Sequence, residues 1–373
     1  MIDTVRKVLG RKYYPLNEIE ISKNALLHNY NYLRKLSSFP VAPVLKSNAY
    51  GHGIEIVGKI LDEINPPLIC VDSIYEAYQL LNIKIETPIL VMGYVSGENL
   101  SVKKLPFSFA VYTEEMLENI KEFQPHAGVH IFVDSGMHRE GVPMDELSIF
   151  LKKAKSLNLN IEGIMSHFAK PDSPLNIKTK NQVDNFEKAI SAGKTLGINF
   201  KLIHLFASNG IRNIKNYRRV DNLTRSGKAL YGIDVEKNSK KLKPVLTLNS
   251  TIIQIKKLKK GEAVGYDFIF KAPRDMTTAI LPIGYNDGVN RRLSNKGFVK
   301  VNGKFAQIIG RVSMNITVID ITDIKNVRVG QKVNIYSNDP MDKNCVFNVA
   351  EITDTIPYEI LTHLNPSTKR ITI

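Results

Sequence analysis

The sequence predicts an α/β protein in which an N-terminal (β/α)8 TIM barrel is followed by a C-terminal, mostly β domain. Eight short apolar runs alternate with amphipathic segments between Val41 and Arg225, as strands and helices do in such a barrel. After Gly232 the pattern changes to short alternating segments separated by turns. The 373 residues are enough for both domains. An open doubly wound sheet is the competing interpretation, but no G-x-G-x-x-G sequence follows the first apolar run.

The barrel elements follow one another in a regular order. Residues 18–21 alternate polar and apolar side chains as a strand does, and Ser22 can cap the helix that follows. The predicted barrel strands are Val41–Leu45, Leu68–Val71, Pro88–Met92, Phe107–Val111, Val129–Val133, Ile161–Met165, Lys201–Phe206 and Leu223–Arg225. The clearest predicted helices between them are Glu114–Phe123, Asp145–Leu157 and Val183–Leu196.

The β domain is expected to begin near Pro244. Residues 1–243 would then form the barrel domain, including a short N-terminal extension and strand at about 1–21, and residues 244–373 would form the β domain. Asn302-Gly303 is typical of a two-residue hairpin turn. The predicted strands are Val245–Ile255, Thr277–Pro282, Gly297–Val301, Gln307–Val312, Thr317–Ile321 and Lys332–Tyr336.

Composition and charge favour a soluble, cytoplasmic globular protein. No apolar run approaches the roughly 20 residues that span a bilayer, and the first ten residues do not resemble a signal peptide. Cys70 and Cys345 lie too far apart for a metal or redox motif. The net charge of +15 is spread along the chain, and its densest cluster, Lys256–Lys260, is expected to be an exposed turn. Because no aromatic side chains are interleaved with this cluster, we do not expect nucleic acid as a partner. The lack of a spanning apolar run predicts no membrane partner either.

The segment Val44-Leu45-Lys46-Ser47-Asn48-Ala49-Tyr50-Gly51-His52-Gly53 carries the first indication of chemistry. An apolar strand ends in Lys46, and loss of water around an ammonium group favours the neutral amine, which can attack an aldehyde. A helix is predicted to begin at Ile54, and Tyr50 and two closely spaced glycines before it suit an anionic group such as phosphate. Taken alone, Lys46 fits equally well a side chain that reaches past the strand end to solvent.

This segment resembles the pyridoxal 5'-phosphate (PLP) lysine motif of the alanine racemase family, V-x-K-A-N-A-Y-G-H-G, with Ser47 in the usual alanine position. Further matches extend the resemblance from about Leu16 to Arg370. It implies a fold-type III PLP enzyme that works as a head-to-tail homodimer and needs no metal. Lys46 would bind the cofactor and act as a catalytic base, and Tyr50 would contact the cofactor.

Other predicted strand ends carry further family motifs. Asp134-Ser135-Gly136-Met137-His138-Arg139 resembles D-T-G-M-x-R, which implies that Arg139 binds the cofactor and the substrate carboxylate. Ser166-His167-Phe168-Ala169 resembles [ST]-H-F-A, which places His167 beside the cofactor ring. An isolated loop arginine or core histidine would be the ordinary interpretation of either residue.

Two later motifs complete the predicted cofactor site. Ser208 is expected to open a short helix and to bind phosphate, as its counterpart in the family does. Arg225-Ser226-Gly227-Lys228-Ala229-Leu230-Tyr231-Gly232 resembles R-x-G-x-A-x-Y-G. By this resemblance Arg225 faces the cofactor's pyridine nitrogen without protonating it, and Gly227 and Lys228 offer backbone N–H groups to the phosphate.

The β domain carries the remaining motifs. Val264-Gly265-Tyr266 resembles V-[SG]-Y, whose tyrosine is the second catalytic base and serves the active site of the other subunit. Met314, in a match to I-G-R-V-[CS]-M-D, would contact the substrate, also across the dimer interface. Tyr358, in a match to I-x-Y-E, would bind phosphate. Without these motifs, the tyrosines would be interpreted as ordinary core or interface residues.

Four further positions depart from the family pattern in ways that bear on the site. Phe132 occupies the place where many members have a lysine whose carbamate orients the motif arginine, so Arg139 must be positioned by another group. Asn315 replaces an aspartate, Asp267 replaces the glycine after the catalytic tyrosine, and Lys228 replaces an apolar residue. The two proposed bases are unaffected, whereas the substrate range is open to change.

The resemblance implies an isomerase that interconverts L- and D-alanine and supplies D-alanine for peptidoglycan in the cell wall. Racemisation needs proton transfer on both faces of the α-carbon. Lys46 would serve the D-isomer and Tyr266 of the partner subunit the L-isomer, with His167 and Arg225 as a cationic pair that assists the tyrosine. The nearest alternative is a same-fold racemase of serine, lysine or arginine.

Two further alternatives are less favoured. A PLP-dependent decarboxylase would carry a cysteine-aspartate motif late in the chain, but Cys345 is followed by Val346 and Phe347. A non-catalytic PLP-binding barrel would not need a β domain with Tyr266.

Overall fold

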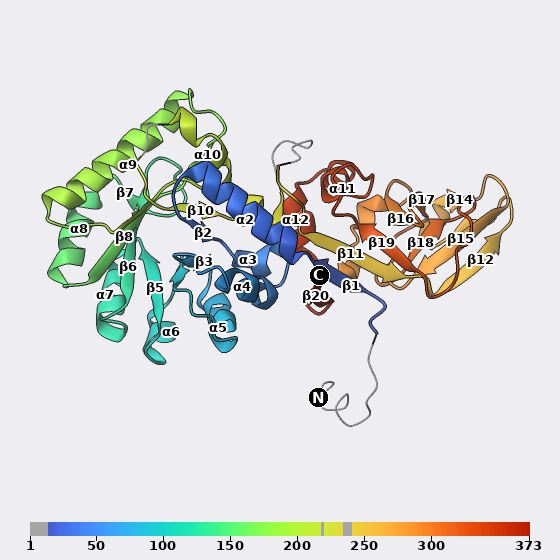
Figure 1. Cartoon of the computed structure of the whole chain (residues 1–373), viewed down its shortest axis with the longest axis horizontal. Helices are drawn as coiled ribbons and strands as arrows, with labels where there is room; N and C mark the ends of the chain where they lie inside the picture. Colours follow the sequence, from blue (N-terminus) through green and yellow to red (C-terminus); the bar gives the residue numbers. More distant parts are fainter. Residues whose placement is uncertain (1–13, 218–219, 234–240) are drawn as a thin grey trace. The chain divides into compact units, whose positions relative to one another are not determined.

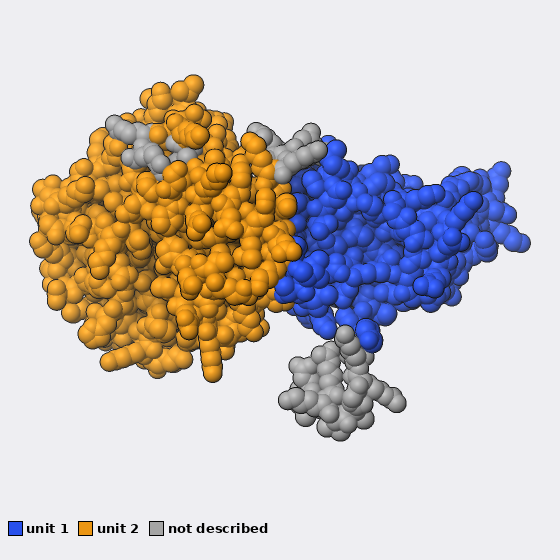
Figure 2. Space-filling model, in the orientation of Figure 1, with its two compact units in different colours: residues 1–22, 244–373 blue, residues 23–243 orange. Residues whose placement is uncertain are grey.

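The chain divides into two compact units in the computed structural model, which describes residues 14–217, 220–233 and 241–373 (Figures 1 and 2). The barrel unit is Lys23–Lys243, drawn in orange in Figure 2. The sheet unit, drawn in blue, combines Met1–Ser22 with Pro244–Ile373.

Parallel strands curl into a closed ring in the barrel unit. Hydrogen-bonded strands run in the order β3-β4-β5-β6-β8-β9, and β2 pairs with β10. A bridge between Val44 and Cys70 joins β2 to β3, and the Asn222 N–H donates to the Ile203 carbonyl at 3.0 Å on the other side. The strands are β2 (Val41–Pro43), β3 (Ile69–Val71), β4 (Ile89–Val91), β5 (Phe107–Val111), β6 (Gly128–Asp134), β8 (Asn160–Met165), β9 (Leu202–His204) and β10 (Thr224–Ser226), with a short β7 (Val142–Pro143) beside β6. The predicted barrel class is confirmed.

Helices lie between successive strands and cover the outside of the ring (Figure 1). Side-chain caps define two of their starts, because Ser73 accepts from the Glu76 N–H and Thr113 from the Met116 N–H. The helices are α2 (Lys23–Ser37), α4 (Ile54–Asp62), α5 (Ile74–Asn82), α6 (Gly97–Ser101), α7 (Glu114–Phe123), α8 (Leu147–Ser156), α9 (Ile177–Thr195), α10 (Ser208–Arg212) and the 3-10 turns η1 (Ile214–Asn216) and η2 (Lys228–Tyr231), with the short α3 (Lys46–Tyr50) after β2.

A packed core fills the barrel interior. Alternate residues of a strand point to the same face, so the strands each send side chains inward. The largest of these is Phe132, whose ring meets the ring of Tyr112 edge to face at 6.0 Å between centroids. The inward-facing buried residues are Ala42, Val44, Leu68, Cys70, Leu90, Ala110, Phe132, Met165 and Leu223.

The sheet unit contains a nine-stranded sheet in the order β12-β15-β18-β17-β16-β19-β11-β1-β20. Its strands are β1 (Glu18–Ile21), β11 (Leu246–Thr251), β12 (Gln254–Leu258), β15 (Met276–Leu281), β16 (Phe298–Val301), β17 (Lys304–Ile309), β18 (Thr317–Asp320), β19 (Lys332–Tyr336) and β20 (Lys369–Thr372). A small hairpin, β13 (Ala263–Val264) and β14 (Phe270–Lys271), and the helices α11 (Val346–Thr353) and α12 (Pro357–Thr362) complete the described part.

The N-terminal strand differs from its predicted place in the barrel domain. β1 lies between β11, to which it is antiparallel, and β20, to which it is parallel. Its period-two pattern explains this place, because Ile19 and Ile21 are fully buried. On the alternate positions, Glu18 and Glu20 both accept from the Lys332 ammonium, at 2.6 and 2.5 Å.

Three local predictions for the β domain have clear outcomes. The Asn302-Gly303 turn is confirmed: it joins β16 to β17 with positive φ at both residues. The single strand predicted at Val245–Ile255 is instead two, because β11 ends at Thr251 and β12 begins at Gln254. The exposed turn predicted at Lys256–Lys260 is only partly correct. Lys256 and Lys257 lie in β12, an edge strand, where lysines discourage pairing with another chain.

We predict that Ile19→Ala lowers the free energy of unfolding of the full chain by about 2–5 kcal/mol, because truncation leaves a cavity under the buried face of the sheet at β1. Ile253→Ala is the control, since that side chain is 39% exposed and should cost at most about 0.5 kcal/mol. Urea denaturation followed by circular dichroism measures both. Equal losses in the two variants would contradict the buried place of β1.

Candidate functional site

The lysine predicted to carry chemistry stands at the start of an unusual turn. Ser47, Asn48 and Ala49 have φ of 54–55° and ψ of 47–51°, and Tyr50 also has a positive φ. These values describe left-handed helix, which costs residues other than glycine roughly 1–2 kcal/mol each. The turn ends with Gly51 N–H donating to Ser47 O at 3.0 Å, and α4 then begins at Ile54, as predicted.

Lys46 has an acidic neighbour that the sequence alone did not identify. Its Nζ lies 3.6 Å from Oδ1 of Asp72, in the loop that follows β3. Both side chains are partly open to solvent, so the ion pair contributes little stability. It places a carboxylate beside the amine.

A set of hydroxyl and backbone N–H groups gathers where β9 and β10 end. Ser208 Oγ accepts from the Gly227 N–H at 3.2 Å and from the Ala229 N–H at 3.3 Å. A Cβ on Gly227 would lie 2.4 Å from the Tyr50 hydroxyl oxygen, so only glycine allows this approach. The structure thus brings together Tyr50, Ser208 and Gly227, with Lys228 beginning η2 directly after them. Hydroxyl and backbone N–H groups are donors that suit an anion, and Tyr50, Ser208 and Gly227 are therefore called the cradle.

Arg225 is buried and donates to three acceptors. Its Nη1 lies 2.7 Å from the His204 carbonyl oxygen and 2.5 Å from His204 Nδ1, and Nη2 lies 2.6 Å from the Ser166 carbonyl oxygen. Burial lowers the pKa of Arg225 to about 10, so the guanidinium still carries its charge at neutral pH.

This contact sets the protons along two histidines inside the barrel. Because an arginine only donates, His204 Nδ1 is the acceptor and its proton is on Nε2. His204 Nε2 then donates to His130 Nδ1, 2.8 Å away. Both imidazoles are therefore neutral. Burial and the charge of Arg225 lower the pKa of His130 to about 3 and that of His204 well below its ordinary value.

His167 does not fit the cationic role that the sequence analysis gave it. Burial, together with the positive charges of Arg225, Arg139 and Lys46, lowers its pKa to about 3. It is a neutral imidazole at physiological pH. Arg225 alone remains as the cation of the expected pair.

Arg139 lies on an ordered loop but contacts an unexpected partner. Asp134 Oδ1 accepts from the N–H groups of Gly136, Met137 and His138 at 2.9–3.0 Å, which shapes the loop. Arg139 Nε then donates to the carboxylate of the adjacent Glu140, and its side chain is half exposed. With Phe132 committed to the barrel core, Glu140 is the group that holds Arg139 here.

The predicted residues of the sheet unit form their own arrangement. Tyr266 begins the 3-10 turn η3 (Tyr266–Phe268) at the tip of the β13–β14 hairpin, and its side chain is 68% exposed. Asp267 accepts from Arg311 Nη2 at 2.9 Å, which ties this tip to the loop that carries Met314. Met314 is exposed, and its carbonyl accepts from the Asn286 N–H at 3.0 Å.

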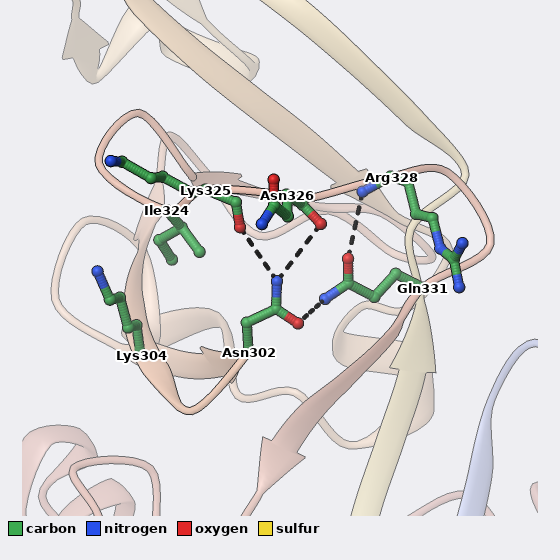
Figure 3. A pocket seen from close by; sticks show the side chains of 7 residues that line it. All are labelled: Asn302, Lys304, Ile324, Lys325, Asn326, Arg328 and Gln331. Carbon is green, nitrogen blue, oxygen red and sulfur yellow. Dashed lines mark hydrogen bonds between the residues drawn. The ribbon is translucent and has the colours of Figure 1, made fainter.

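Tyr358 lies on α12 and is partly exposed. None of the predicted site residues lines the pocket of about 700 Å³ in the sheet unit that Figure 3 shows. In that pocket Asn302 donates to the carbonyls of Lys325 and Asn326, at 3.2 and 3.5 Å, and accepts from Gln331 Nε2 at 2.6 Å. The side-chain amides of Asn302 and Gln331 therefore hold the loops around the pocket together.

The described part of the chain contains neither a metal-type cluster nor a membrane-spanning helix. Within 14–217, 220–233 and 241–373, no three His, Cys, Asp or Glu side chains are grouped so that they could hold a metal ion. No helix in those same ranges is both long enough and apolar enough to cross a membrane.

Sequence reasoning missed Asp72, Glu76, His130 and His204. Only Glu76 had a recognisable pattern, since Ser73-x-x-Glu76 is a capping box that predicts a helix start. The others became visible only when the strands were placed side by side, because each depends on a residue far away in the sequence.

The fold and the gathered groups define a class of enzyme in which a parallel barrel presents a lysine and an anion cradle. Two family models match the chain: "Alanine racemase, N-terminal domain" over residues 21–235 and "Alanine racemase, C-terminal domain" over residues 245–372. The chain belongs to the alanine racemase family and is an enzyme of that family.

Individual relatives match nearly all of the chain. "Alanine racemase 1" of Clostridium acetobutylicum is 34% identical over 367 residues, which cover 95% of this chain and 94% of the relative. The structure of alanine racemase from Bacillus anthracis with bound L-Ala-P is 29% identical, with a TM-score of 0.86 over 97% of this chain and 96% of that chain. Alanine racemase from Bartonella henselae, with covalently bound pyridoxal phosphate, is 27% identical, with a TM-score of 0.84 over 96% of this chain and all of that chain (100%).

We predict that the neutral histidines make the protein sensitive to acid. The unfolded chain takes up a proton on each histidine below about pH 6.5, whereas buried His130 does so only near pH 3. Stability therefore falls as the pH drops through this window, by about 1.4 kcal/mol per pH unit for each such histidine.

The variant His130→Gln removes one of these titrations. The slope of unfolding free energy against pH, measured by urea denaturation between pH 6 and 4, should decrease by about 1.4 kcal/mol per pH unit. The slope is compared rather than the absolute stability, because the substitution also alters packing. An unchanged slope would contradict a neutral, buried His130.

Proposed function

We propose that this protein is a PLP-dependent racemase that interconverts L- and D-alanine. The observation that carries the proposal is the position of Lys46, Arg225 and the Tyr50–Ser208–Gly227 cradle at the carboxyl ends of β2, β9 and β10. Membership of the alanine racemase family and the pyridoxal phosphate in the Bartonella henselae relative support the same conclusion.

The residues present fit PLP in three respects. The two hydroxyls and the backbone N–H groups of the cradle suit a phosphate, and the Gly227 backbone approaches so closely that no side chain fits there. Lys46 would bind the carbonyl carbon of the cofactor, and Lys228 would add its N–H to the phosphate site. His167, being neutral, would lie beside the ring. Tyr358 and Arg139 are proposed contacts from the family motifs.

When bound, PLP withdraws electrons from the substrate and so acidifies its α-proton. The Lys46 amine would accept or return that proton on one face of the α-carbon. A second base must act on the opposite face, and for it we propose Tyr266 of the partner subunit. Inversion follows when one base takes the proton and the other supplies one.

Arg225 would control how far the cofactor takes up charge. Its guanidinium is fixed by hydrogen bonds to the carbonyls of His204 and Ser166. It acts only as a hydrogen-bond donor and stays protonated at neutral pH. Beside the pyridine nitrogen it would therefore leave that nitrogen unprotonated. This restraint favours return of the α-proton over other reactions of the same cofactor. In the proposed assembly, Arg225 is also the cation that assists the tyrosine.

We infer that the protein forms a homodimer, because two of the proposed site residues lie on exposed loops of the sheet unit. Tyr266 and Met314 lie on loops held by Asp267–Arg311 and by the Asn286 N–H, so both are presented in fixed positions although their side chains are exposed. A close approach sets this geometry, because a Cβ on Gly284 would lie 2.1 Å from the Ser313 carbonyl oxygen. We propose that this surface completes the site of a second copy.

The physiological role proposed is supply of D-alanine for the cell wall in the cytoplasm. Alanine is preferred as substrate because of the family membership, and serine, lysine or arginine is the alternative. The pairing of Arg139 with Glu140 motivates that alternative, since it changes the surroundings of the arginine proposed to bind the substrate carboxylate.

The first test of function is a panel of L-amino acids. We expect purified protein with added PLP to racemise L-alanine faster than it racemises L-serine, L-lysine or L-arginine. Chiral chromatography measures each rate. Lys46→Ala is the control and should lose both the visible absorbance of the bound cofactor and the activity by at least about 1,000-fold. Faster turnover of another amino acid would refute the assignment of alanine as the preferred substrate.

The second test concerns Tyr266. In Tyr266→Phe, exchange of the α-proton with deuterated solvent should fall by about 100-fold or more from L-alanine and much less from D-alanine, because only one face loses its base. Mass spectrometry of each enantiomer measures this. Phe268→Leu, at an exposed position of the same turn, is the control for local disturbance. If exchange in Tyr266→Phe is unchanged, or falls by the same factor for both enantiomers, the two-base mechanism is refuted.

A further inference from the structure

One buried carboxylate joins the loop after β2 to the loop after β3. Glu76 Oε1 accepts from the Ser47 N–H at 2.6 Å and from the Asn48 N–H at 3.4 Å. Its Oε2 accepts from the Asp72 N–H at 2.9 Å and from the Ser73 N–H at 3.3 Å. The side chain is 8% exposed. A single carboxylate thus receives four backbone donors from two loops.

Each of these loops carries a group of the site. Ser47 follows directly after Lys46, so the bond from its N–H fixes the peptide unit that Lys46 shares with it. Asp72 carries the Oδ1 that lies 3.6 Å from Lys46 Nζ. Glu76 therefore holds both the backbone of the lysine and the acid that faces its amine.

The left-handed turn is the reason such a holder is needed. The first N–H groups of a helical turn have no acceptor within it, and Ser47 and Asn48 begin the turn with a costly backbone conformation. Hydrogen bonds to a carboxylate are about twice as strong as those between neutral groups. Glu76 supplies them to Ser47 and Asn48.

A third loop supports the same arrangement from the next strand. The Gly93 N–H donates to the Asp72 carbonyl at 2.9 Å. A Cβ on Gly93 would lie 2.2 Å from that oxygen, so the two backbones are in direct contact. Asp72 is held on one side by Glu76 and on the other by Gly93.

We propose that Glu76 is a positioning residue for the reaction, acting through Lys46 and Asp72 without touching the substrate. The inference rests on the proposed function of Lys46. The capping residue of α5 thus has a second role, which is to fix the position of the Lys46 backbone and of the carboxylate that faces its amine.

The test is Glu76→Gln, with two measurements. An amide offers one acceptor oxygen, and its NH2 group would face two N–H donors, so one loop must come free. Hydrogen exchange of the cofactor-free protein should become at least about tenfold faster in residues 45–53. With saturating PLP, kcat for alanine should fall by about 10- to 100-fold with little change in KM, because the base is displaced and the binding groups are not.

Ser73→Ala is the matched control. Ser73 Oγ accepts from the Glu76 N–H at 3.2 Å, so its loss weakens the cap of α5 but leaves the carboxylate and its bonds to Ser47 and Asn48. This variant should keep exchange in residues 45–53 and kcat within about threefold of the unsubstituted protein. If Glu76→Gln does not fold, Glu76→Asp, which keeps the charge but is shorter, takes its place with the same readouts.

The outcomes separate the two proposals. Unchanged exchange in Glu76→Gln, or an equal loss of kcat in Ser73→Ala, overturns the positioning role of Glu76. Absence of racemase activity in the unsubstituted protein overturns the proposed function and the positioning role with it, whereas the exchange measurement needs neither cofactor nor turnover.

Discussion

The left-handed turn after Lys46 is the constraint on which the site depends. It keeps the chain compact after β2, because the Ala49 N–H donates to the Leu45 carbonyl at 2.8 Å and α4 starts only at Ile54. Because the turn is unfavourable on its own, neighbouring loops must hold it. The loops after β2, β3 and β4 consequently behave as one braced group and not as three independent connections.

Among the described residues of the barrel unit, one arginine and no lysine has a buried side chain. Arg225 is the buried cation, and the histidines near it are neutral because a second positive charge there would be both desolvated and repelled. The donor and acceptor roles in the hydrogen bonds from Arg225 to His204 and from His204 to His130 are fixed by Arg225, because an arginine cannot accept a hydrogen bond. An imidazole in this position serves as a rigid spacer with a defined donor and acceptor.

Sequence reasoning reached the elements that depend on local pattern. The barrel strands, the start of α4 at Ile54 and the hairpin at Asn302-Gly303 follow from periodicity and turn chemistry. It failed where partners lie far apart in the chain. β1 was assigned to the wrong unit because its alternation is the same whichever sheet receives it, and His167 was given a charge because a pKa depends on surrounding cations that no local motif describes.

The insertion of β1 between β11 and β20 bears on how the chain is made. The first strand of the sheet leaves the ribosome long before its two neighbours exist, since those follow the whole of residues 23–243. During synthesis the barrel unit can close first, as N-terminal units generally do. Ser22 and Val245, the two points at which the chain enters and leaves that unit, are joined by a hydrogen bond of 2.9 Å. A folded barrel would keep these points near each other and so reduce the entropy lost when β11 finds β1. The sheet unit would then form after the barrel unit, once both of its chain segments have been made.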